Sequence, residues 1–375
     1  MSVRAAGCAT GLRRFGVGWL LAALGAGLHA ATFQAGEWPV DVTVVPDQPT
    51  ITLGEPTWLS FKVTNRSDEG LQILVGGDYQ NDLGRPASFT IRTVGQDGKW
   101  VAQLDAGDGT GGLIGPRDLP PGGSQVFRLF VPHWATFTEA GSYTFICRRT
   151  LQLLRPAPDG NFVKQPTSDV SVEVRTKLGV LPRDADRMGR LIAELGETML
   201  RAGGEKAGDD PTVGLAWIDD PRVVPYFRRA LKIRSYALKF VAVYALGKFA
   251  TEEALEGLKA GMATSAADFD YTRSESSGQL AVNIRVAAAG ALSRCPHPQA
   301  REFLLAQRHD EAESVRLAVL HAVARLPPAQ AKPLLEETTR DQSAFVRDEA
   351  QRYLTKLGQK TQRDAPKYGS AARAR

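Results

Sequence analysis

The chain has 375 residues, of which 43% are hydrophobic and 23% charged, and its formal net charge at pH 7 is +5. The positive excess comes from residues 1–30 and 359–375, and the segment between them has a net charge of about −2. Nucleic-acid binding needs a basic face on the folded domain itself, so this distribution excludes nucleic acid as the expected partner. Beyond residue 30 only Cys147 and Cys295 remain, and their separation indicates neither a disulfide framework nor a metal site.

Residues 1–30 have the pattern of a secretory signal peptide. Three arginines precede a short apolar run at 15–28, and cleavage is expected after Ala30. The run contains four glycines and is too short to span a membrane comfortably, which favours a cleaved signal over an anchor. The sequence therefore predicts a periplasmic or secreted protein with no transmembrane segment after signal removal.

Residues 31–176 are predicted to form an antiparallel β-sandwich. Apolar and polar residues alternate from Val40 to Val44, a period of two that is typical of half-buried strands. Turns rich in Gly, Pro, Asn and Asp separate many short segments of this kind. The stretch from Glu139 to Phe145 resembles the acidic-x-Gly-x-Tyr-x-Cys pattern of immunoglobulin-like domains, and residues 52–65 resemble their second-strand region. The resemblance implies that the Tyr143 hydroxyl bonds back to the main chain, in a domain with Phe145 where antibody domains have cysteine.

Residues 177–220 are predicted to be a linker that contains a capping helix. Between Ala185 and Ala202, apolar residues recur on one helical face, which indicates an amphipathic helix that covers the first unit of the segment that follows. That apolar face consists of Met188, Leu191, Ile192, Leu195 and Met199.

Residues 221–358 contain four copies of a helix pair at a period of 31 residues. The second helices align on the basic column Lys239, Arg285, Arg316 and Arg347, with steps of 46, 31 and 31 residues. The first helices step by 31, 46 and 31 residues and so show the long step one unit later, which places an insertion between the two helices of the second unit, at 263–279. This insertion is polar and aperiodic, and we expect an exposed loop. A fixed period of this kind predicts stacked helices that share one core.

Two sets of basic residues repeat with the helices. Asp310 and Asp341 precede Arg316 and Arg347 by six residues, so each Asp is expected to cap a second helix while Asp and Arg bridge neighbouring turns. A second basic column is expected to stabilise the carboxyl-terminal ends of the second helices. It comprises Lys248, Arg294, Arg325 and Lys356. The alternative is that the two columns form a basic binding stripe. Their placement on opposite sides of the helix argues against that alternative.

The segments 310–326 and 341–357 resemble HEAT repeats of the short bacterial type, also named after phycobilisome lyases. The matching features are the turn Asp, the Val-Arg pair and the Ala-rich helix. The resemblance implies a HEAT-type α-solenoid and carries no lyase activity with it. The complete expectation is thus an all-β plus all-α chain: an immunoglobulin-like sandwich, then the solenoid, then a disordered basic tail at 359–375.

The expected function is non-catalytic binding or scaffolding of a protein partner in the cell envelope. The sequence contains no recognisable catalytic motif, and no cofactor or metal site is expected. The candidate contact residues are Asp268, Phe269, Asp270 and Tyr271, because the repeat geometry does not require them. In the alternative interpretation, Phe269 and Tyr271 fold back onto the helices.

Two other functions remain open from the sequence alone. The first is envelope glycan binding by aromatic residues of the sandwich. Those residues are Trp38, Trp58, Trp100 and Trp134. The second is a hydrolase with an unrecognised site, which a cluster of carboxylates of raised pKa in a cleft between the domains would favour.

Overall fold

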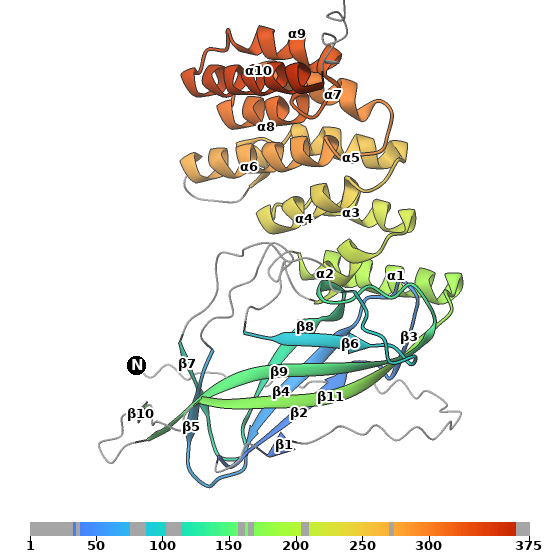
Figure 1. The fold of residues 1–375 in the computed structure, drawn as a ribbon, viewed down its shortest axis with the longest axis vertical. Coiled ribbons are helices and arrows are strands. Elements are labelled where there is room, and N and C mark those ends of the chain that lie inside the picture. Colours follow the sequence, from blue (N-terminus) through green and yellow to red (C-terminus); the bar gives the residue numbers. More distant parts are fainter. Residues whose placement is uncertain are drawn as a thin grey trace, which may run out of the picture.

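The computed structural model describes residues 33–34, 38–75, 88–102, 115–156, 162–163, 169–203, 210–269 and 274–364. An amino-terminal sheet-rich domain is followed by a stack of helices (Figure 1). The expected signal peptide at 1–30 and residues 365–375 of the expected tail lie outside the described residues. Within the described part of the chain, no helix is both long enough and apolar enough to cross a membrane.

The sheet-rich domain contains two sheets. The first has the strand order β1-β2-β4-β8, with β1 (Phe33–Gln34), β2 (Val40–Pro46), β4 (Trp58–Asn65) and β8 (Ser124–Phe130). The second has the order β3-β11-β9-β5-β7, with β3 (Thr50–Thr52), β11 (Asp169–Leu181), β9 (Gly141–Pro156), β5 (Leu71–Leu74) and β7 (Pro116–Leu119). Strands β6 (Thr90–Val94) and β10 (Phe162–Val163) also pair with β9.

Alternating residues of the two sheets meet in one hydrophobic core. In β2, Val40, Val42 and Val44 are buried while the residues between them are half-buried. They share a core cluster with residues of β9 and β11 such as Phe145. The Tyr143 hydroxyl donates a hydrogen bond to the Glu139 carbonyl oxygen at 2.8 Å, which ties the start of β9 to the turn before it.

The boundary between the domains differs from the expected one at residue 176. Strand β11 continues to Leu181, and its residues 179–181 pair in parallel with β3. Leu178 and Val180 are buried in the sheet core. The segment after Arg175 is therefore sheet, because Leu178 and Val180 continue the alternation of buried Val172 and Val174 in the strand that precedes it.

The helical region consists of helix pairs stacked on one another. The predicted capping helix is α1 (Ala185–Ala202), which begins where the Asp184 carboxylate accepts hydrogen bonds from the amides of Asp186 and Arg187. Its partner α2 (Asp210–Trp217) was not predicted. The four expected pairs follow as α3 (Val224–Ala230) with α4 (Tyr236–Leu246), α5 (Glu252–Met262) with α6 (Ser274–Leu292), α7 (Ala300–Ala306) with α8 (Glu313–Val323), and α9 (Pro328–Thr338) with α10 (Ala344–Asp364).

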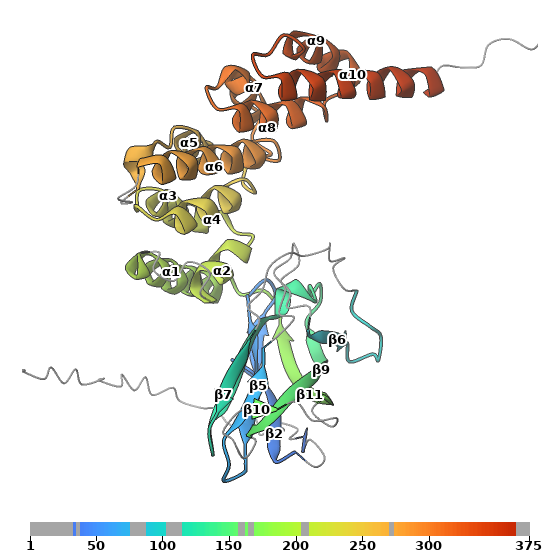
Figure 2. The same cartoon turned by 90° about the vertical axis from the view of Figure 1, so that its left-hand side faces the viewer.

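The second helices α2, α4, α6 and α8 form one row of the stack, and the first helices form the other (Figure 2). Apolar residues at the repeated positions are buried in a single cluster that runs from α1 to α10. For example, Ala242, Ala288 and Val319 occupy one column and are each at most 1% exposed. The last helix continues to Asp364, beyond the expected end of the repeats at residue 358.

The sheet-rich domain contacts the helical region through charged and aromatic residues. The Arg128 guanidinium lies 2.5 Å from carboxylate oxygens of Asp47 in the sheets and of Asp210 in α2. Arg187 of α1 pairs with Glu55 at 3.0 Å, and the Glu55 side chain is only 3% exposed. Helix α2 presents Gly214 to Trp58, where an added Cβ would meet the indole at 2.7 Å. Only glycine permits this close approach between the domains.

Candidate functional site

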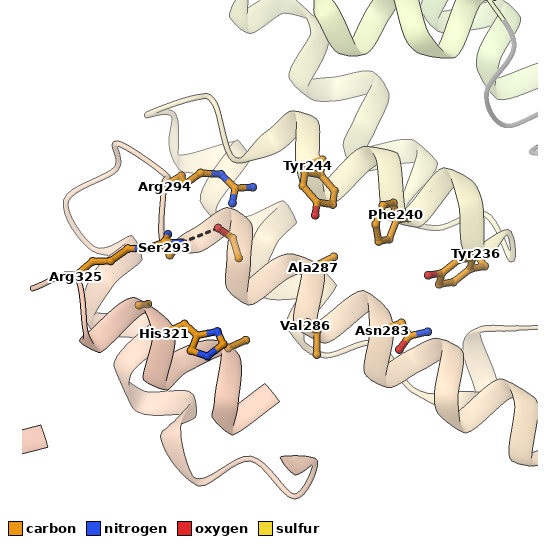
Figure 3. A pocket seen from close by; sticks show the side chains of 13 residues that line it. Tyr236, Phe240, Tyr244, Asn283, Val286, Ala287, Ser293, Arg294, His321 and Arg325 are labelled. Carbon is orange, nitrogen blue, oxygen red and sulfur yellow. Dashed lines mark hydrogen bonds between the residues drawn. The ribbon is translucent and has the colours of Figure 1, made fainter. Parts of the chain in front are cut away.

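A groove with a volume of about 400 Å³ runs along the row of second helices (Figure 3). Helices α4, α6 and α8 and the residues just after α6 and α8 supply its walls. The lining residues are Tyr236, Phe240 and Tyr244 of α4, residues between Asn283 and Gly290 of α6, Ser293 and Arg294 after α6, Ala318, His321 and Ala322 of α8, and Arg325 after α8. We call this hollow the α4–α6–α8 groove.

One wall of the groove is a row of aromatic rings. Tyr236, Phe240 and Tyr244 stand four residues apart, so α4 carries them on one face. The ring centroids of Tyr236 and Phe240 are 5.8 Å apart, and those of Phe240 and Tyr244 are 4.9 Å apart. Tyr244 is 48% exposed, whereas Tyr236 and Phe240 are half-buried. The three rings therefore offer an apolar surface to the groove.

The groove exists because a glycine stands between two large side chains. Gly290 occupies the repeat position that Tyr244 occupies in α4 and His321 in α8. A Cβ built on Gly290 would meet only the Arg294 Nη1 atom, at 3.8 Å, and is otherwise in open space. Helix α6 thus leaves a gap at the position where the neighbouring helices α4 and α8 carry the large side chains of Tyr244 and His321.

Two exposed guanidinium groups stand at one end of the groove. Arg294 and Arg325 each follow the last residue of their helix by two positions. The Arg294 guanidinium carbon lies 5.5 Å from the centre of the Tyr244 ring. The sequence assigned both arginines to the helix termini, whereas the structure also places them on the rim of the groove. Their Lys248 counterpart instead donates to carbonyl oxygens of Ala216, Trp217 and Ile218 at the end of α2.

The other basic column forms contacts between successive repeats. Arg316 donates from Nε and Nη2 to the Asp341 carboxylate at 2.8 and 2.9 Å. Arg285 lies 3.4 Å from the Asp310 carboxylate, and Lys239 lies 3.8 Å from that of Asp268. Each cation therefore reaches an acid of the following turn and ties one repeat to the next.

The same cations and acids also stabilise the turns before the second helices. The Nη1 atoms of Arg316 and Arg347 donate to the carbonyl oxygens of Asp310 and Asp341, respectively, at 2.9 and 2.7 Å. The Asp310 and Asp341 carboxylates each accept from a main-chain amide two residues on, at 2.8 Å. Burial would raise the pKa of Asp341, but the hydrogen bonds from Arg316 and Ser343 lower it. The basic column and the aspartates that precede it therefore have structural roles.

In its described residues, 263–269 and 274–279, the insertion differs from the expected exposed loop. It contains a short 3₁₀ helix at Ala266–Asp268, and α6 begins at Ser274. Phe269 is only 4% exposed and packs beside Tyr236, with ring centroids 6.5 Å apart. The expectation of an exposed Phe269 is therefore wrong, and the fold-back interpretation holds for this residue. Asp270 and Tyr271 lie outside the described residues.

Asp268 has a defined structural role in the insertion. Its carboxylate accepts from the Ser265 amide at 2.8 Å and from the Ser265 hydroxyl at 3.1 Å. Burial would raise its pKa, but these hydrogen bonds and the charge of Lys239 lower it. Lys239 in turn is 3% exposed, and burial lowers its pKa. The Asp268 side chain is still 41% exposed and accessible to a partner.

Three of the four tryptophans considered for a sugar-binding platform are buried. Trp38, Trp58 and Trp134 are 4%, 8% and 2% exposed, because they pack in the core or against the helical region. Trp100 alone of the four is exposed, at 58%, with the Arg92 guanidinium 5.6 Å from its ring centre. Three of the four residues on which the glycan hypothesis was based are therefore not accessible to a sugar.

Neither a carboxyl group of raised pKa nor a cluster of metal ligands is found among the described residues. Every described carboxyl group whose pKa is shifted has it lowered, as for Asp220, where the Arg222 hydrogen bond brings the pKa to about 2. Nor do three His, Cys, Asp or Glu side chains in that part of the chain come together as metal ligands.

The sequence analysis missed the aromatic row and Gly290. A signal for them was present: Tyr236, Phe240 and Tyr244 have helical spacing but lie off the buried stripe of Leu238, Ala242 and Ala245. Large aromatic residues beside a core face, instead of on it, indicate a surface available for contact.

Comparison with known proteins agrees with the repeat assignment. Residues 279–355 match the family model of HEAT repeats. No curated protein matches the chain. Among solved structures, the crystal structure of Spo0M, a sporulation control protein from Bacillus subtilis, is similar at 11% identity and a TM-score of 0.20, over 43% of this chain. The chain spans only 56% of that protein, and a score this low says nothing about fold or function. The helical region therefore contains HEAT repeats.

Proposed function

We propose that this chain is a non-catalytic protein-binding or scaffolding protein and that its partner lies in the α4–α6–α8 groove. HEAT repeats suggest a role in protein interaction. The observation that carries the proposal is the aromatic row of α4, with Tyr244 exposed and Tyr236 and Phe240 half-buried, beside the gap at Gly290. Aromatic and arginine side chains are enriched at the centres of protein interfaces, and this groove combines both.

Further elements of the proposal rest on the sequence. Residues 1–30 support export, which would place the partner in the cell envelope. The two sheets with a shared core and the Tyr143–Glu139 hydrogen bond support an immunoglobulin-like sandwich before a HEAT-type solenoid. Asp268, Asp270 and Tyr271 of the insertion are a second, smaller candidate contact.

The test fills the groove without disturbing the fold. Gly290→Leu places a side chain in the gap, and replacing a helical glycine favours the helix itself. Gly278→Leu is the matched control, because it lies in the same helix with nothing within 4 Å of its added Cβ and does not line the groove.

Full-length wild type and both variants serve as bait for proteins of the native cell extract, quantified by mass spectrometry. We expect a partner that wild type and Gly278→Leu capture equally and that Gly290→Leu loses at least about tenfold, since an obstructed interface centre costs about 2 kcal/mol or more. A partner that all three proteins capture equally well would show that the groove is not its binding site.

A further inference from the structure

The charges around the groove point to the chemistry of its occupant. Arg294 and Arg325 are exposed, and no carboxylate lines the groove. Within the described part of the chain, neither guanidinium forms an ion pair, whereas Arg285 and Arg316 of the other basic column are paired with acids. The two guanidinium groups at the groove thus retain hydrogen-bond donors for an external acceptor.

A second hollow continues the groove past Arg325. It has a volume of about 510 Å³ and shares Ser293, Ala322 and Arg325 with the α4–α6–α8 groove. Four leucines contribute to its lining, together with Arg301, and it too contains no carboxylate. The second hollow is of mixed polarity, with the half-buried Leu305 and Leu326 beside polar and cationic side chains, and Arg325 stands between the two hollows.

We propose that this double hollow binds a linear acidic segment of the partner protein. Apolar side chains of the segment occupy the two hollows, and carboxylates between them pair with Arg294 and Arg325. A guanidinium matches a carboxylate in a two-pronged hydrogen bond, which makes arginine a selective partner for it. Since exposed ion pairs add little affinity on their own, the apolar anchors supply most of the binding and the charges select the sequence.

The chain's own carboxyl-terminal tail does not fit this description. Residues 359–375 contain five basic residues and one acid, so the arginines would repel them. This proposal rests on the proposed function, since it names the partner that the groove would take.

The probe is a random 12-residue peptide library displayed on phage and selected on the full-length protein. We expect the selected peptides to contain Asp or Glu flanked by aromatic or aliphatic residues. The best peptide is then synthesised, together with a version in which Asn and Gln replace its acids. Binding of both versions is measured by fluorescence anisotropy.

Two double variants distinguish the effect of the rim charges on peptide binding from the effect of the protein's net charge. Arg294→Gln with Arg325→Gln removes the rim cations, and Lys232→Gln with Arg340→Gln removes two exposed cations outside both hollows. We expect the rim variant to weaken the acidic peptide about tenfold and the control variant less than twofold, as charge-assisted contacts imply. The amide peptide should bind the wild type about tenfold more weakly and should be unaffected by the rim variant.

The outcomes distinguish this proposal from the proposed function. Peptides that Gly290→Leu excludes but that lack acids, or that bind the rim variant as tightly as wild type, overturn the acidic-segment proposal and leave the groove as the binding site. A library that yields no peptide weakened by Gly290→Leu overturns both. A selected peptide that matches a segment of this chain would instead identify a second copy as the partner and would also contradict the proposal.

Discussion

The contact between Arg316 and Asp341 allows a stringent test of how the repeats are held together. Arg316 is 5% exposed and forms four hydrogen bonds, two to the Asp341 carboxylate and two to the carbonyl oxygens of Asp310 and Glu311. Removing one partner of a buried ion pair costs about 3–5 kcal/mol, because the remaining charge stays buried without its counter-charge. Asp341 keeps its bond from the Ser343 amide. We therefore expect Arg316→Met to cost about 3 kcal/mol.

Arg347→Met provides the matched control within the same column. Arg347 donates to the carbonyl oxygens of Asp341 and Gln342 in its own turn, and no carboxylate of a following repeat accepts from it within the described residues. Its loss should cost about 1 kcal/mol. Urea unfolding of the full chain, followed by circular dichroism at 222 nm, measures both. Equal losses for the two variants would refute the inter-repeat bond as a main source of stability.

Three further outcomes are expected from the contacts described above. Phe269→Ala should lower the unfolding free energy by about 3 kcal/mol in the same assay, and a loss below about 1 kcal/mol would mean that the ring is not buried. The pKa of Asp220 is lowered from 3.8 to about 2, mainly by Arg222, so its contribution is complete above pH 4 and disappears as the pH falls through 2. Asp220→Asn should therefore cost about 2 kcal/mol at pH 7 and flatten the stability loss between pH 4 and 2, whereas an unchanged acid profile would contradict this assignment. Gly214→Val should separate Trp58 from α2 and expose a protease-sensitive site between the domains; limited proteolysis identical to wild type would contradict a close contact there.

Much of the helical architecture could be read from the sequence, because a 31-residue period repeats the buried positions of each pair. The α1 limits at Ala185 and Ala202 were predicted correctly, since a clear apolar stripe and the Asp184 cap define them. Helix α2 was missed because it has only eight residues and its apolar side chains show no amphipathic period. The start of α6 was predicted as part of a loop because its first residues, from Ser274 to Gln279, are polar or glycine and show no apolar period.

The groove could not have been predicted in the same way. Periodicity within one helix reveals its buried face, whereas a groove depends on which side chains stand opposite each other on neighbouring helices. Gly290 creates a gap only because Tyr244 and His321 flank it in the adjacent helices. Likewise, the sequence could not show that Trp58 packs against Gly214, because residues far apart in the chain come together only in the folded structure.

Photo-crosslinking from two exposed aromatic positions tests the binding surface most directly. Tyr244 lies in the groove and is 48% exposed, and Trp100 lies in the sheet-rich domain and is 58% exposed. Each is replaced in turn by p-benzoylphenylalanine in the full chain, which is irradiated with the captured partner or the selected peptide. The proposed function requires a covalent adduct from position 244 and none from position 100. An adduct from position 100 with none from position 244 would place the partner on the sheets and contradict the groove as the binding site.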